Sequence, residues 1–188
     1  MKYINEEVLR INKQYIIVAN HNSHIDTVAI LSVVPFKKLK SVHPVAAGDY
    51  FGSSPVKAFF TKAFVNAILI PRKRAEKPGD PDPIEIMQGV LAKGESIIIF
   101  PEGSRGEPEK FQKFKKGIGL LLKDFPDVPF IPVYMQGLGK SLPKGDTVLV
   151  PHDSTILFGR PHFVKSQNVD EIVLQIEEAI KSMEPKLN

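Results

Sequence analysis

A histidine and an aspartate that follow a short apolar run could form the basic half of an active site. His21 and Asp26 are five residues apart, directly after the apolar residues 15–19. On one straight helix, side chains at this spacing would point about 140° apart, so they can meet only if His21 lies in a turn and Asp26 in the first turn of the next helix. An Asp that accepts from one imidazole nitrogen leaves the other as a base, able to take a proton from a hydroxyl group.

The same stretch has other interpretations. Ser23 or Asn22 can cap the helix that follows, and Ser23-x-x-Asp26 is also a capping-box variant in which the aspartate serves only the helix start. His21 could then be a turn residue bonded to the backbone. The spacing His21-x-x-His24 hints at a metal, but the sequence offers no third ligand nearby, so no metal site is expected.

A second set of chemically capable residues follows the apolar residues 97–100. Pro101 is succeeded there by Glu102, Gly103, Ser104 and Arg105. The glycine would let the backbone approach a ligand closely, and the arginine offers a fork of donors suited to phosphate. The glutamate could bond ligand hydroxyls or hold the arginine. The alternative is an exposed Glu–Arg pair on a polar turn, which would contribute little.

Short apolar runs alternate with helix-like segments along the chain. The runs are rich in Val and Ile, as is typical of strands buried on both faces, and span residues 15–19, 42–47, 67–70, 96–100 and 130–135. Helices are predicted over residues 25–34, 55–65, 83–92 and 114–125. The alternation predicts an α/β layered single domain over residues 1–188, with helices flanking a largely parallel or mixed central sheet. Since ligands bind beyond the carboxyl ends of such strands, we expect His21 and Glu102 to share one crevice.

The C-terminal part of the chain has a different pattern. Two shorter strands are predicted over residues 147–150 and 155–158, and a final helix over residues 169–183. That helix carries its apolar residues on one stripe and its acids on the other face, which indicates packing against the core. Residues 72–83, rich in Pro and charge, are interpreted as a surface loop, with a mobile cover over the site as the alternative.

Composition excludes several classes of protein. The 188 residues contain no Cys, so no disulfide, thiolate nucleophile or Cys-based zinc site is possible. No apolar stretch is long enough for a spanning helix, and the N-terminus lacks the pattern of a signal peptide. The net charge of +4 is uneven, because residues 37–74 hold eight Lys or Arg against one acid. That basic segment favours phosphate-bearing partners.

The two polar turns resemble the N-H-x-S-x-x-D and F-P-E-G-T-R motifs of the glycerolipid acyltransferases. The family's second motif, G-x-x-x-I-x-R, matches residues 66–72, and its V-P-x-x-P-V motif matches residues 128–133. Residues 114–117 look like the usual sequel to the third motif. The ordered resemblance spans residues 15–134 and is more specific than any single motif.

The chain also departs from the family pattern. Asn66 stands where the family prefers Gly, which puts the backbone arrangement there in doubt, and Ser104 replaces Thr. Gly106 stands where Ser is common. The hydrophobic or helical N-terminal extension that anchors many members is not recognised, so the resemblance leaves the mode of membrane attachment open.

The resemblance implies an O-acyltransferase that needs no cofactor. It would move a fatty acyl group from acyl-CoA or acyl carrier protein (acyl-ACP), as co-substrate, to a lysophospholipid hydroxyl, in particular from 1-acyl-glycerol-3-phosphate to phosphatidate. His21 would be the general base and Asp26 its orienter. The residues that would bind the acceptor are Arg72, Glu102, Gly103, Ser104 and Arg105. This implied role makes the chain a transferase of phospholipid biosynthesis.

Lipid substrates imply contact with a bilayer. The expected location is cytoplasmic, with peripheral association at the inner face of a membrane. Residues 57–64 combine three Phe with two Lys on a predicted helix that could dip into the headgroups, although the Phe side chains could equally face the core. No nucleic-acid partner is expected, because no DNA or RNA signature accompanies the basic charge.

Two other functions remain open at the level of sequence. A lipid esterase or serine hydrolase would need the nucleophile elbow G-x-S-x-G, which does not occur. A non-catalytic phospholipid-binding module would use the basic segment over residues 37–74 to bind phosphate, and His21 would not act as a base.

Overall fold

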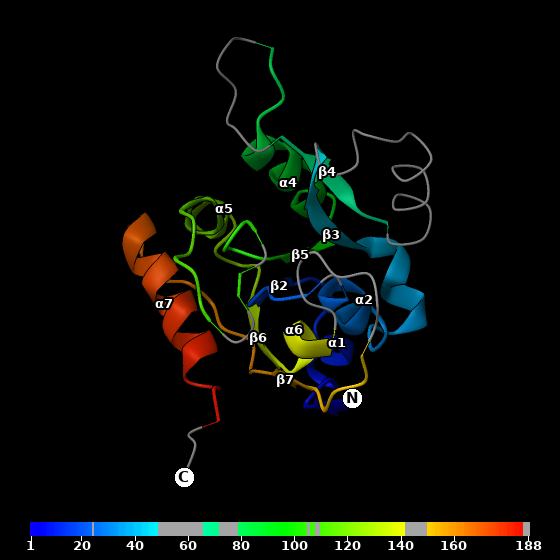
Figure 1. Ribbon diagram of the computed structural model, residues 1–188. Helices are drawn as coiled ribbons and strands as arrows, with labels where there is room; N and C mark the ends of the chain where they lie inside the picture. Colours follow the sequence, from blue (N-terminus) through cyan, green and yellow to red (C-terminus); the bar gives the residue numbers. More distant parts are fainter. Residues whose placement is uncertain are drawn as a thin grey trace.

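The chain folds into helices packed on both faces of one sheet (Figure 1). The computed structural model describes residues 1–23, 25–48, 66–71, 79–104, 106–107, 110–141 and 150–185. One face of the sheet packs against α1 (Val8–Ile11), α2 (Asp26–Leu31) and α6 (Leu138–Ser141), and the other against α4 (Pro83–Leu91), α5 (Gly117–Asp124) and α7 (Val169–Lys181). The predicted α/β layered architecture is confirmed.

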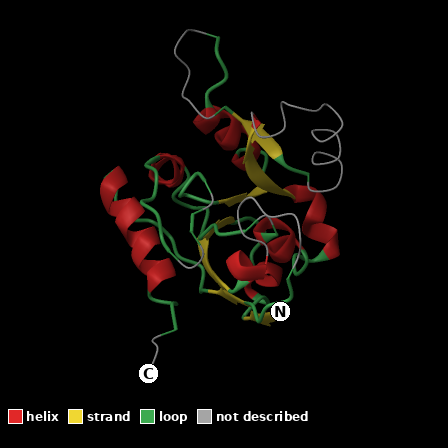
Figure 2. Cartoon of the chain, in the orientation of Figure 1, coloured by secondary structure: helices red, strands yellow, loops and turns green. Residues whose placement is uncertain are grey.

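Seven strands of the described residues form the sheet (Figure 2). They are β1 (Lys2–Ile4), β2 (Ile16–Ala19), β3 (Val42–Ala47), β4 (Ile68–Ile70), β5 (Ser96–Ile99), β6 (Phe130–Gln136) and β7 (Thr155–Phe158). Their order across the sheet is β1-β7-β6-β2-β5-β3-β4. The neighbouring strands are parallel except β6 and β7, which are antiparallel. The sheet is therefore mixed and largely parallel, as the sequence predicts.

The central strands are apolar on both faces because helices cover both faces. In β2, Ile16 and Val18 belong to the core beneath α4, α5 and α7, whereas Ile17 and Ala19 belong to the core beneath α1 and α2. All four are fully buried. Successive side chains of a strand point to opposite faces, so a run without polar alternation is what two covered faces require.

Recognisable signals begin two of the helices. At α4, the Asp82 side chain accepts a hydrogen bond from the N–H of Ile84, and Pro83 occupies the first turn. At α7, the Asn168 side chain accepts from the N–H groups of residues 170 and 171. The apolar stripe of α7 is buried through Ile172, Ile176 and Ile180, four residues apart, which confirms its predicted packing against the core.

Helix α5 begins three residues later than predicted. The N–H of Lys115 donates to the carbonyl oxygen of Pro101, 2.8 Å away, so the residues before Gly117 are held against another loop. Inside α5, a side chain at Gly119 would overlap the backbone oxygen and side chain of Val169. This glycine therefore allows the close contact between α5 and α7.

The sequence did not predict several short elements: β1, α1, α6 and the 3₁₀ helix η1 (Phe36–Ser41). Strand β1 exists through pairing with β7, about 150 residues along the chain, where Lys2 lies opposite Thr155. Some predictions lie outside the described residues: the helix over 55–65, with the proposed membrane face at 57–64, most of the loop over 72–83, and all but the last residue of the strand over 147–150. Residue 150 itself is not in a strand.

Candidate active site

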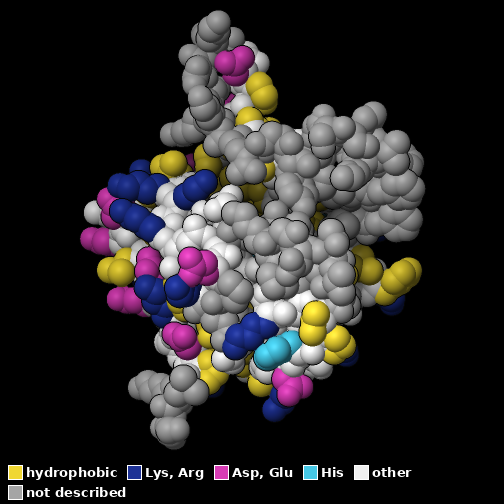
Figure 3. Space-filling model, viewed as in Figure 1, with side chains coloured by type: hydrophobic (Ala, Val, Ile, Leu, Met, Phe, Trp, Pro, Cys, Tyr) yellow, Lys and Arg dark blue, Asp and Glu magenta, His cyan; other side chains and the backbone are white. Residues whose placement is uncertain are grey.

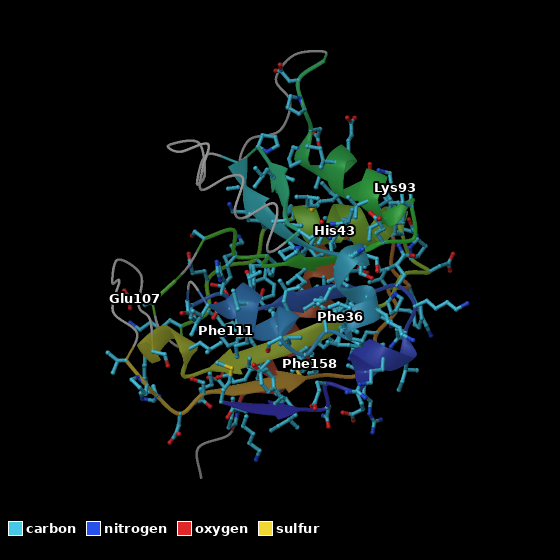
Figure 4. The ribbon with its side chains drawn as sticks, turned by 90° about the vertical axis from the view of Figure 1, so that its right-hand side faces the viewer. Phe36, His43, Lys93, Glu107, Phe111 and Phe158 are labelled. Atoms are coloured by element: carbon cyan, nitrogen blue, oxygen red, sulfur yellow. The ribbon has the colours of Figure 1, made fainter. Side chains whose placement is uncertain are left out.

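The two polar turns leave the sheet side by side. Strand β2 lies parallel to β5, with Val18 opposite Ile99, so the residues that follow both strands emerge at the same edge. Figure 4 shows this edge at the left, where Glu107 and Phe111 are labelled, and the opposite edge at the right, near Lys93. The predicted meeting of the two turns at one edge is confirmed.

His21 and Asp26 meet as predicted. His21 Nδ1 lies 2.9 Å from Asp26 Oδ2, and the aspartate is fully buried. The backbone N–H groups of Asn22 and Ser23 donate to the same carboxylate oxygen, each at 2.8 Å. Asp26 therefore holds the turn and the imidazole at once, so its role is not confined to the helix start.

Ile25, and not Ser23 or Asn22 as predicted, occupies the N-cap position of α2, and it makes no side-chain capping bond. The N–H of Ile25 nevertheless donates to Ser23 Oγ at 3.4 Å, and Asp26 Oδ2 accepts from the N–H of Ser23 at 2.8 Å. These reciprocal bonds are those of the capping-box variant that the sequence suggests. The side chain that begins the helix is thus the one that orients the histidine.

The geometry leaves one nitrogen of His21 as a base. A carboxylate only accepts hydrogen bonds, so Nδ1 carries the proton and Nε2 the lone pair. Within the described part of the chain, Nε2 has no hydrogen-bond partner. The ring stacks on Phe100 at 4.1 Å between centroids, and 19% of the side chain is exposed. Asp26 at one edge and Phe100 at one face thus fix the orientation of the ring, while solvent or substrate can still reach the ring.

Asn20 secures the start of this turn, a role that the sequence did not reveal. Its side chain donates to the backbone oxygen of Met135 at 2.8 Å and accepts from the N–H of the same residue at 2.7 Å. These bonds continue the β2–β6 pairing by one side chain. Asn20 therefore fixes the backbone next to His21.

Glu102 joins the two turns. Its Oε1 accepts from the backbone N–H of His21 at 3.0 Å, and its Oε2 from that of Gln112 at 3.2 Å. Burial raises the pKa of this carboxyl to about 7; the two N–H donors oppose the rise and the negative charge of Asp26 adds to it. With only 3% of the residue exposed and both oxygens engaged, Glu102 has the geometry of a positioning residue. Its predicted contact with the acceptor stays a prediction.

The rest of the second turn is open. Gly103 is exposed and adopts a φ of 73°, a left-handed conformation that glycine accepts without strain. Ser104 is also exposed, and its backbone oxygen accepts from the Gln112 side chain at 3.1 Å. The N–H of Gly106 donates to the backbone oxygen of His21 at 3.1 Å. The turn is therefore bonded to His21 on both sides of the arginine position.

Both predicted arginines, Arg72 and Arg105, lie outside the described residues, as does His24. The structure thus brings together His21, Asp26, Glu102 and Gly103. Phe100 and Gln112, which the sequence did not single out, complete the surroundings of the histidine and the glutamate. The spacing of residues along the sequence does not reveal these contacts of Phe100 and Gln112.

Asn66 shows how the chain accommodates its departure from the family's second motif. Its φ is 53°, a left-handed value that Asn tolerates better than most residues. Its side chain donates to the backbone oxygen of Lys40 at 2.9 Å, and its own backbone oxygen lies 3.0 Å from His43 Nδ1. The asparagine thus adopts a conformation favourable to glycine and stabilises it with side-chain bonds.

No three potential metal-ligating side chains gather among the residues that the structure describes. None of the helices in those ranges combines the length and the apolar character that crossing a bilayer requires.

Comparisons with known proteins point in one direction. The sequence pattern of the family described as Acyltransferase matches residues 1–136. The chain is 26% identical over 145 residues to the 1-acyl-sn-glycerol-3-phosphate acyltransferase BAT2, chloroplastic, of Brassica napus, covering 77% of this chain and 39% of that one. It is 27% identical over 128 residues to 1-acyl-sn-glycerol-3-phosphate acyltransferase alpha of Homo sapiens, covering 66% and 41%. The chain thus spans about two fifths of the length of these relatives.

A solved structure shares the fold. The 1-acyl-sn-glycerophosphate acyltransferase PlsC from Thermotoga maritima superposes with a TM-score of 0.73 at 20% identity. The match covers 100% of this chain and 73% of that one. Every layer described above thus lies within the matched region.

Proposed function

The chain belongs to the acyltransferase family, and from that premise we propose that it transfers a fatty acyl group from a thioester to a lysophospholipid hydroxyl. The proposed acceptor is 1-acyl-glycerol-3-phosphate and the product phosphatidate. The proposed donor is acyl-CoA or acyl-ACP. Support comes from the family match, from the names of the relatives and from the geometry of the site.

The observation that carries the proposal is the pairing of His21 Nδ1 with a buried Asp26 carboxylate. It leaves Nε2 as the proton acceptor, beside a turn that is bonded to the histidine backbone through Glu102. No described hydroxyl group is hydrogen-bonded to the His21 ring, so nothing in this part of the chain supports a serine nucleophile. An incoming acceptor hydroxyl is the group that the base would deprotonate.

The reaction then needs no covalent enzyme intermediate. His21 Nε2 takes the proton of the acceptor hydroxyl as its oxygen attacks the thioester carbonyl carbon, and a tetrahedral intermediate forms. When the carbon–sulfur bond breaks, the departing thiolate takes the proton back from the imidazolium. Asp26 stays ionised, holds Nδ1–H and stabilises the positive ring. The products are the ester and the free thiol, and the histidine returns to its starting state.

The acceptor would reach this site from a bilayer. We propose peripheral association with the inner, cytoplasmic face of a membrane. The net charge of +4 supports attraction to anionic lipid, which contributes about 1 kcal/mol for each Lys or Arg near the surface.

One experiment tests the function directly. The protein is incubated with isotope-labelled acyl-CoA or acyl-ACP and, in separate reactions, with 1-acyl-glycerol-3-phosphate, glycerol 3-phosphate and other lysolipids. Products are identified by mass spectrometry. We expect labelled phosphatidate as the principal product.

The other outcomes discriminate between functions. Labelled free fatty acid without any ester product would favour a hydrolase. Saturable binding of the lysolipid without turnover of either donor would favour a binding module. Ester formation on a different lysolipid would keep the transferase and replace its acceptor.

A further inference from the structure

A short segment after the Glu102 turn runs back across it. We call residues 110–116 the strap. The N–H of Lys115 donates to Pro101, and the backbone and side chain of Gln112 donate to Glu102 and to the Ser104 backbone. These three hydrogen bonds fix where the side chains of the strap begin.

The side chain of Lys115 lies across Gly103. A β-carbon at this glycine would overlap the Nζ, Cε and Cδ atoms of Lys115, so the absence of a side chain is what makes room for the ammonium. Gly103 has a left-handed φ of 73°, and the Lys115 side chain lies over the same turn. The Lys115 ammonium therefore places a positive charge beside the exposed Gly103.

This ammonium is available to a ligand. Lys115 is exposed, and its Nζ makes no hydrogen bond or ion pair with any residue of the described ranges. Two other lysines of the strap are engaged: Lys110 pairs with Glu107, and Lys116 Nζ lies 2.7 Å from Asp170 Oδ1. Lys113 is exposed but is not among the atoms nearest Gly103.

The surrounding charges favour an anion at this place. Asp26 is buried and paired with His21, and Glu107 is neutralised by Lys110. Burial raises the pKa of Glu102 to about 7, which lowers its negative charge near neutral pH. Figure 3 shows Lys and Arg side chains over α5 and the neighbouring part of α7, with Asp and Glu side chains among them. The N-terminus of α5, with its partial positive charge, directly follows the strap.

We propose that Lys115 binds the phosphate of the acceptor lipid over the Gly103 turn. The inference rests on the proposed function and adds a residue to the acceptor site. Glu102 bonds the turn to the backbone of His21, so a phosphate held there keeps the glycerol close to the base. An ammonium–phosphate contact is a charge-assisted hydrogen bond, and its loss would weaken binding about 10- to 100-fold.

The test compares Lys115→Met and Lys115→Arg with the matched control Lys113→Met. A six-carbon 1-acyl-glycerol-3-phosphate, used below its micelle concentration, provides KM and kcat, and the same lipid without phosphate provides the reference acceptor. We expect Lys115→Met to raise KM for the phosphorylated acceptor about 10- to 100-fold. We expect kcat and the donor KM to stay within about threefold, and Lys115→Arg and Lys113→Met to resemble the wild type.

A binding measurement separates this inference from the proposed function. Glycerol 3-phosphate is titrated into each protein without donor and followed by amide chemical shifts, with thermal melting as a check on folding. Wild-type protein that binds the phosphate but transfers no acyl group would contradict the function and leave the inference standing. Equal affinity of wild type and Lys115→Met, no saturable binding by wild type, or an equal loss in Lys113→Met would overturn the inference.

Discussion

The described residues contain two histidine–carboxylate pairs, at opposite edges of the sheet, and the pairs differ in which ring nitrogen they leave available. At the carboxyl edge, His21 Nδ1 contacts the buried Asp26 carboxylate at 2.9 Å and Nε2 has no partner in the described structure. At the other edge, His43 Nδ1 lies 3.0 Å from the backbone oxygen of Asn66. Its Nε2 lies 3.1 Å from Glu95, at ion-pair distance without the alignment of a hydrogen bond.

The comparison shows that a base is defined by the nitrogen that remains available. Both histidines are partly exposed, 19% for His21 and 12% for His43, so exposure alone does not separate them. His43, in β3, lies with Nδ1 against the backbone oxygen of Asn66, two residues before β4, and with Nε2 against Glu95, the residue before β5. His21 uses one nitrogen and stacks its ring on Phe100. The His43 pair connects elements of the fold, whereas the His21 pair presents one nitrogen.

The largest effect is expected when the presented nitrogen is removed. His21→Ala should lower kcat for acyl transfer about 10²- to 10⁴-fold, because general-base assistance is lost. Steady-state transfer to 1-acyl-glycerol-3-phosphate measures it. Thermal melting controls for folding, and a near wild-type rate in a folded variant would remove His21 from the mechanism.

Neutralising the partner of His21 should have the next largest effect. Asp26→Asn keeps the size of the side chain but cannot stabilise the imidazolium, so kcat should fall about 10²- to 10³-fold. Because both residues act as one unit, the double variant with His21→Ala should be no slower than His21→Ala alone. Additive losses in this cycle would show that the pair does not act together.

Glu102 should give stability a pH dependence of its own. Its folded-state pKa of about 7 lies above the ordinary value of 4.5, so the folded protein holds this proton more tightly than the unfolded chain does. Its contribution is therefore fully present below pH 4.5, declines as pH rises, and is lost above pH 7. Allowing for solvent screening, the decline is on the order of 1–3 kcal/mol.

Glu102→Gln tests this dependence. Urea unfolding at pH 5 and pH 8 should show that wild type loses stability relative to Glu102→Gln across this interval. Glu178→Gln, at an exposed position on α7, is the control and should leave the interval unchanged. A constant difference between wild type and Glu102→Gln at both pH values would contradict the raised pKa.

The smallest effect on activity is expected at the other histidine. His43→Gln should change kcat and KM by less than about twofold, because no step uses this residue, and should cost about 1 kcal/mol of stability through weakened bonds to Asn66 and Glu95. Transfer assays and urea unfolding measure the two quantities. A tenfold loss of kcat in a stable variant would erase the distinction between the two pairs.

Much of the fold could be predicted because its signals are local. A strand such as the one within residues 96–100 is apolar on both faces when helices cover both faces of the sheet. Helix α4 begins with a capping Asp82 and with Pro83 in the first turn, which are common start signals. Strand β1 could not be predicted, because it is three residues long and is stabilised by pairing with β7. The start of α5 at Gly117 differs from the predicted start at residue 114, and the preceding residues are instead held by a hydrogen bond from Lys115 to Pro101, a contact that the local sequence does not reveal.

The sequence by itself determined that a histidine and an aspartate would stand together after one strand, since a turn followed by a helix start is the one local geometry that joins them. It also determined the layered architecture, because the apolar patterns of strands and helices can be recognised from residues that are close together in the sequence. The tertiary structure alone decided that Glu102 would bond the backbone of His21, that Lys115 would lie across Gly103, and that His43 would lie between Asn66 and Glu95. Those contacts join residues that are 12 to 81 positions apart, and they depend on strand order and loop packing, which spacing along the chain does not encode.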